Sequence, residues 1–139
     1  MSNDLLNEKD EVVFKQVSGI MEEFRTGVIN NSFSGAKWYT EKLDVLTGSY
    51  GYLCERFSRI RTTRNNNEVK KFVSIKHEVE SNGGKFTATS AEREAREFVS
   101  DLALAEHILE GYKESALQGM NTCKKQIEVL LEERKMEAR

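Results

Sequence analysis

The last third of the chain has a spacing of apolar residues that predicts a long α-helix. From Phe98 to Cys123, apolar or small residues recur at alternating steps of four and three, which places them along one side of a helix. Thr89 and Glu92 have the spacing of a capping box, so we predict one helix over residues 89–134. The members of this apolar seam are Phe98, Leu102, Ala105, Leu109, Tyr112, Ala116, Gly119 and Cys123.

Composition agrees with long helices. Proline, which breaks helices, is absent from the 139 residues, and the 38% apolar and 32% charged fractions are typical of elongated helices with solvated faces. We therefore expect a single all-α domain over residues 1–139, an elongated helical hairpin or bundle with coiled-coil packing. We also expect a homo-oligomer, because the long seam exceeds what one neighbouring helix covers. The residues predicted to contact other chains are Phe98, Leu102, Leu109, Tyr112, Ala116 and Cys123.

Two further helices are expected before the last one. Residues 1–9 are polar and are predicted to be frayed, and helical spacing then predicts a first helix over residues 10–25. Residues 26–35 are rich in Gly, Asn and Ser and form a connection, in which Ser34 is the candidate N-cap of a second helix over residues 35–62. The apolar seam of this second helix is Tyr39, Leu43, Leu46, Tyr50, Leu53, Phe57 and Ile60.

Two glycines, Gly48 and Gly51, lie three residues apart within this second helix. They either allow a neighbouring helix to approach closely, or are tolerated at a cost of up to about 1 kcal/mol each relative to Ala. The sequence leaves both interpretations open.

Residues 63–88 form a basic insert for which the sequence allows two conformations. Asn65 to Asn67 predict a break after the second helix. In one alternative, residues 68–80 form a helix. In the other, alternating apolar residues form a strand and Asn82-Gly83 turns the chain into a short β-hairpin around residues 71–89. We favour the helix because the surrounding segments are helical.

The sequence offers little that indicates catalysis or membrane insertion. No apolar run reaches membrane-spanning length and no signal-peptide pattern follows Met1, so we expect a soluble intracellular protein with no membrane partner. Cys54 and Cys123 lack metal-ligand spacing and are expected to be buried free thiols. His77 and His107 also lack partners at such spacing, and no phosphate-loop, dinucleotide-binding or nucleophile-elbow motif is present. We therefore predict no catalytic residue, no metal and no cofactor.

Charge is distributed unevenly along the chain. Residues 55–86, which we call the basic island, contain eight Lys+Arg and four Glu, a net charge of +4. The whole chain contains 21 Lys+Arg and 23 Asp+Glu, so the remainder carries −6. A positive segment in an acidic chain indicates a binding surface for phosphate groups.

The cations of the basic island are therefore candidates for contacts with single-stranded nucleic acid. The guanidinium group of Arg suits phosphate, and the nearby Tyr50, Tyr52, Phe57 and Phe72 suit base stacking. An alternative is that cations near the end of a helix complement its dipole. The predicted nucleic-acid-binding residues are Arg56, Arg59, Arg61, Arg64, Lys70, Lys71 and Lys76.

The order and spacing of several motifs resemble the UvsY-type phage recombination mediators. Trp38 stands at the head of a long helix, and the basic pair Arg59-Ile60-Arg61 follows about two dozen residues later. After a polar insert, the final helix opens with Ser90-Ala91-Glu92 and has a small-residue centre at residues 114–117. The resemblance covers roughly residues 36–135.

The resemblance implies a protein without catalytic activity that assembles into a ring. Such proteins bind single-stranded DNA and the recombinase, and help the recombinase to displace single-strand-binding protein. By position, the resemblance implies DNA contacts at Arg59 and Arg61, assembly through the seam of residues 98–123, and a location in the host cytoplasm if the chain is phage-encoded. A hypothesis of another class is a helical adaptor, assembly chaperone or inhibitor that acts through protein–protein contacts.

Overall fold

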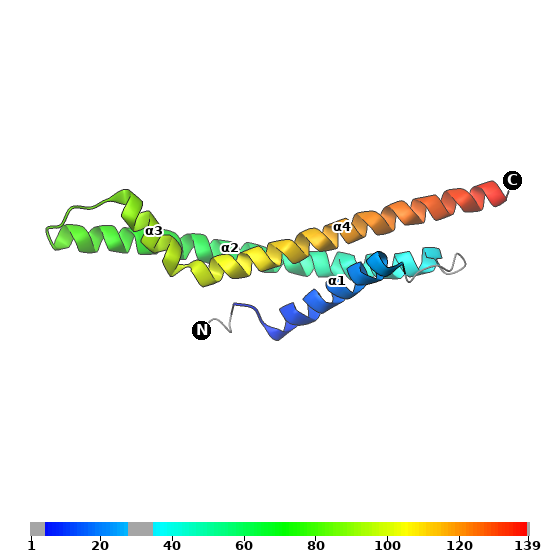
Figure 1. Ribbon diagram of the computed structural model, residues 1–139, viewed down its shortest axis with the longest axis horizontal. Helices are drawn as coiled ribbons and strands as arrows, with labels where there is room; N and C mark the ends of the chain where they lie inside the picture. Colours follow the sequence, from blue (N-terminus) through cyan, green and yellow to red (C-terminus); the bar gives the residue numbers. More distant parts are fainter. Residues whose placement is uncertain (1–4, 28–34, 139) are drawn as a thin grey trace. The chain divides into compact units, whose positions relative to one another are not determined.

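The structure is a computed structural model that describes residues 5–27 and 35–138. These residues form helices and no strand, so the predicted all-α class is confirmed, as is a long C-terminal helix (Figure 1). The helices are α1 (Glu8–Thr26), α2 (Gly35–Ser81), α3 (Ala88–Phe98) and α4 (Ser100–Glu137).

Residue contacts divide the described part of the chain into two compact units. Each unit is described by itself. The first unit comprises residues 5–6 and 56–109, and the second comprises residues 7–27, 35–55 and 110–138. The expectation of one single domain stays a prediction.

In the second unit, α1 begins two residues before its predicted start. The Asp10 N–H donates to Asn7 Oδ1 at 2.8 Å, and the Asn7 N–H donates to Asp10 Oδ2 at 2.9 Å, which completes a capping box. Residues 7–9 are therefore the cap and first turn of α1, and the prediction that they are frayed is wrong. α1 ends at Thr26 and is capped by Gly27, whose φ of 62° suits glycine. The predicted connection over residues 28–34 and the Ser34 cap lie outside the described residues.

The core of the second unit forms where α1 packs on α2 and α4. The Phe14 ring of α1 stacks on the Tyr112 ring of α4, with centroids 4.1 Å apart. A Cβ at Gly119 would lie 2.8 Å from Leu46 Cδ1 and 3.0 Å from Met21 Sδ, so Gly119 allows the three helices to approach closely. The other fully or nearly buried apolar residues here are Val13, Val17, Ile20, Leu53, Ala116 and Cys123.

The two glycines of α2 do not have the role of Gly119. Gly48 and Gly51 are exposed, and a Cβ at either position would meet no atom within 4 Å. The interpretation in which the helix tolerates them is therefore confirmed.

In the first unit, α2 continues without a break through Asn65, Asn66 and Asn67 to Ser81. The predicted break is wrong because Asn65 and Asn66 are exposed, and asparagine in a solvated helix costs only about 0.7 kcal/mol or less relative to Ala. The helical alternative for residues 68–80 is confirmed.

The Asn82-Gly83 pair ends α2 instead of forming a hairpin turn. The Gly84 N–H donates to Val79 O at 3.0 Å and the Gly83 N–H donates to Glu80 O at 3.2 Å, while Gly83 has φ 72°. This is a Schellman stop, which uses glycine for the same left-handed conformation that a hairpin turn needs. The β-hairpin alternative around residues 71–89 is therefore wrong.

The predicted helix over residues 89–134 is divided at Val99. Thr87 is the N-cap of α3 and makes no side-chain cap hydrogen bond, whereas Thr89 lies inside the helix, so the predicted capping box with Glu92 is wrong. Val99 has φ −102° and ψ 16° and is 2% exposed, so its burial accompanies the bend between α3 and α4. The second part of the prediction, a long helix to the C-terminus, is confirmed over Ser100–Glu137.

Candidate nucleic-acid interface

The seven predicted DNA-binding cations all lie on α2, but they do not share one face. Successive residues of a helix are rotated by about 100°, so Arg59 and Arg61 lie about 160° apart around the axis. The pair that the resemblance assigns to DNA is thus divided between nearly opposite sides of α2. Lys70, eleven residues after Arg59, lies on the Arg59 side.

Two of the seven cations hold the first unit together. The Arg56 Nη2 donates to Leu5 O at 2.6 Å. The Arg64 Nε donates to Glu106 Oε1 of α4 at 2.5 Å, and its Nη1 donates to Glu68 Oε1 at 3.0 Å. The hydrogen bond with Glu106 raises the pKa of Arg64 further above its usual value, because it stabilises the charged form. These guanidinium groups are engaged in contacts within the chain.

Three other cations lie over phenylalanine rings of the first unit. The Arg61 guanidinium lies 5.7 Å from the centroid of the Phe57 ring. Lys76 Nζ lies 5.7 Å from the Phe86 centroid, and Lys71 Nζ lies 4.9 Å from the Phe98 centroid. Cations over aromatic rings are attracted by the ring quadrupole, which restricts their orientation.

The predicted aromatic platform is only partly assembled. Phe57 and Phe72 lie in the first unit, where Phe72 packs edge-on against Phe86 with centroids 5.6 Å apart. Tyr50 and Tyr52 belong to the second unit. Tyr52 Oη donates to Asp10 Oδ1 at 2.6 Å, and a hydrogen bond with Cys54 raises the pKa of Tyr50.

The exposed residues of α2 between positions 58 and 77 include no carboxylate. The only acid in this interval, Glu68, is half-buried and paired with Arg64. The exposed side chains are instead cations, hydroxyls, amides, His77 and two valines. The exposed cations of this stretch are Arg59, Arg61, Lys70 and Lys76.

One side of this stretch combines cations with aromatic rings. Arg61, Asn65, Phe72 and Lys76 follow at steps of four, seven and four, which keeps them on the same side of α2. We call these four residues the Arg61 row. Both of its cations lie over rings, and the row leads toward Phe86, which contacts Phe72 and Lys76.

Sequence reasoning missed a hollow at the end of α2. It has a volume of about 310 Å³ and lies between the last turns of α2, residues 85–87 and the start of α3. Most of its lining comes from residues 71–89, which the hairpin alternative placed in a β-hairpin.

The seam predicted to contact other chains is largely used within the chain. Leu109, Ala116 and Cys123 are fully buried, and Tyr112 stacks on Phe14. Leu102 is half-buried, whereas Phe98 is 61% exposed. Of the six residues predicted to contact other chains, Phe98 alone has most of its side chain exposed, and oligomerisation through this seam stays a prediction.

The remaining chemistry-bearing side chains are dispersed. Within residues 5–27 and 35–138, no three His, Cys, Asp or Glu side chains are grouped so that they could hold a metal ion. Cys123 is a buried free thiol as predicted, and Cys54 is a half-buried one. None of the helices in the described part of the chain has the length and apolar character needed to cross a bilayer.

Comparison with known proteins gives no relative: no family model, no curated protein and no solved structure matches this chain.

Proposed function

We propose that this chain is a non-enzymatic protein that binds single-stranded DNA through α2 and acts as a recombination mediator. The observation that carries the proposal is the carboxylate-free exposed surface of α2 from residue 58 to residue 77, in a chain that is otherwise acidic. Phosphate groups are attracted to such a surface and meet no repelling charge on it.

The Arg61 row is the part of this surface best arranged for a single strand. Arg61 and Lys76 are separated by 15 residues, or about 22 Å of helix, which a strand of several nucleotides spans. Both cations are exposed and already oriented by rings, so little side-chain freedom is lost when phosphate binds. Contacts of this kind position the strand without reading its bases.

A few cations in each chain give weak binding, so the proposal includes assembly. A ring of chains would multiply weak contacts along one strand into useful avidity. The resemblance to phage recombination mediators supplies the remaining parts of the proposal. These are recombinase and single-strand-binding protein as partners, and the cytoplasm of the host cell as the location.

The proposal is tested by fluorescence anisotropy of a labelled single-stranded oligonucleotide titrated with the protein. We expect the double variant Arg61→Ala with Lys76→Ala to bind more weakly for every base sequence. The matched control is Arg134→Ala with Lys135→Ala, which removes the same two residue types from the exposed end of α4. Equal affinities for the first variant and the unchanged protein would refute the proposed surface.

A second candidate is the helical adaptor, chaperone or inhibitor, and exposed apolar side chains favour it. Phe98 of α3 and Leu104 of α4 are 61% and 60% exposed, and large exposed apolar side chains are a common feature of protein–protein contacts. If the folded protein fails to bind single-stranded DNA even at low salt, this class becomes the better explanation.

A further inference from the structure

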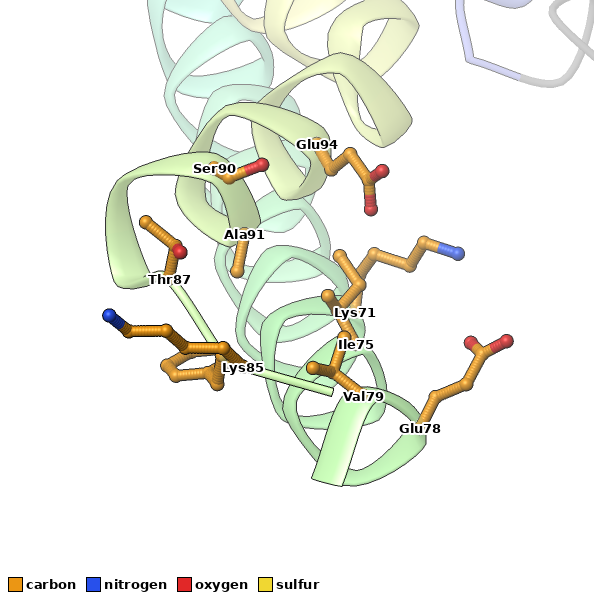
Figure 2. A pocket seen from close by; sticks show the side chains of 10 residues that line it. Lys71, Ile75, Glu78, Val79, Lys85, Thr87, Ser90, Ala91 and Glu94 are labelled. Atoms are coloured by element: carbon orange, nitrogen blue, oxygen red, sulfur yellow. The ribbon is translucent and has the colours of Figure 1, made fainter. Parts of the chain in front are cut away.

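The hollow at the end of α2 has two chemically different sides. Figure 2 shows the Glu78 and Glu94 carboxylates with Lys71 on one side and Lys85 with Thr87 on the other, while Ser90 lies between Thr87 and Glu94. The apolar side chains of Ile75, Val79 and Ala91 lie between the two sides, and Phe86 completes the lining.

Lys71 lies over the Phe98 ring, and the other polar side chains of the hollow are exposed to solvent. Among the described residues, no hydrogen bond or ion pair joins the side chains of Glu78, Glu94 or Lys85 to a neighbour. Its volume of about 310 Å³ lies at the lower limit for small-ligand sites, which suits a ligand the size of one nucleotide. A ligand that fits both sides needs an anion at one end and hydrogen-bond donors at the other.

We propose that the hollow accepts one nucleotide of the bound strand and prefers cytosine to thymine. The proposal rests on the proposed function. The phosphate lies at Lys85 and the Thr87 hydroxyl, and the base lies on the apolar side chains of Ile75, Val79 and Ala91. The N4 amino group of cytosine donates to Glu78 or Glu94, and its O2 accepts from Lys71. Thymine instead places the acceptor O4 against the carboxylates, which gives repulsion where cytosine gives a hydrogen bond.

The hollow is placed where a strand on the Arg61 row would reach it. Lys71 and Ile75 come from the same turns of α2 as Phe72 and Lys76 of the row. Phe86 belongs to both the hollow and the surroundings of the Arg61 row, since it lines the hollow and contacts Phe72 of the row. The base preference is therefore added to binding that otherwise ignores sequence.

The test compares dissociation constants for labelled oligo(dC) and oligo(dT) of equal length. We expect the unchanged protein to bind oligo(dC) about fivefold more tightly, the lower end of the discrimination given by a carboxylate on the cytosine amino group. In the double variant Glu78→Ala with Glu94→Ala, the two affinities become equal. The matched control is Glu80→Ala with Glu92→Ala, which removes the same charge from exposed positions of the same two helices outside the hollow and retains the preference.

The outcomes separate this inference from the proposed function. Equal binding of oligo(dC) and oligo(dT) by the unchanged protein overturns the nucleotide site and leaves the DNA-binding surface standing. Loss of the preference in the Glu80/Glu92 control also overturns it, because charge alone would then explain the effect. Absence of binding to either oligonucleotide overturns the proposed function itself.

Discussion

Removing the two cations of the Arg61 row should change how salt affects DNA binding. Three exposed cations, Arg61, Lys76 and Lys85, are positioned to neutralise phosphates in the proposed complex. For single strands, the slope of log affinity against log salt is about −0.7 per neutralised phosphate, or about −2.1 for three. A rise from about 50 to about 200 mM salt should then weaken binding by the unchanged protein about 20-fold for each chain engaged.

The double variant Arg61→Ala with Lys76→Ala retains only Lys85 of these three. Its slope should become less steep, at about −0.7, so the same rise in salt weakens binding only about threefold. The assay is fluorescence anisotropy at four or more salt concentrations, with an oligonucleotide short enough to engage one chain. A variant with the slope of the unchanged protein would refute the reasoning, because the two removed cations would then release no counterions.

Three further predictions concern stability and reactivity. Arg64→Ala should lower the free energy of unfolding in urea by about 2–3 kcal/mol, because it leaves two partly buried carboxylates without their partner. Unchanged urea stability would contradict the role of this ion pair. Gly119→Ala should lower stability by up to about 2 kcal/mol, because the added Cβ displaces Leu46 and Met21 and the gain in helix propensity offsets only part of that cost, whereas Gly48→Ala should raise stability by up to about 1 kcal/mol. The reverse order in thermal unfolding would show that the close approach at Gly119 is absent. Burial raises the pKa of the Cys123 thiol, so it remains protonated at higher pH than an ordinary thiol. Iodoacetamide should therefore modify Cys54 first in the folded protein, as read by mass spectrometry.

The seams of α2 and α4 were predictable because helical spacing of apolar residues reports burial directly. Leu46, Leu53, Leu109 and Cys123 were placed on seams and are fully buried. The bend at Val99 was not predictable in the same way. The predicted seam passes through Phe98, whereas the structure buries Val99, and no Gly or Pro marks the position.

The candidate surface was predictable in charge but not in arrangement. The net charge of the basic island identified the segment, yet only the structure shows that Arg56 and Arg64 are engaged within the chain. Their partners, Leu5 and Glu106, are far away in the sequence, so no local pattern indicates them. Because the sequence predicted a break at Asn65 to Asn67, it did not show that the residues of the Arg61 row lie on one continuous helix.

The bend at Val99 leaves the backbone hydrogen bonds on both sides intact. The Val99 N–H donates to Ala95 O at 3.3 Å, and the Ala103 N–H donates to Val99 O at 2.9 Å. Within α3 only Ala91 and Ala95 are buried, and alanine side chains remove little apolar surface from water. The apolar contacts of α3 itself are therefore small, and we expect this short helix to open locally more readily than the long helix α2.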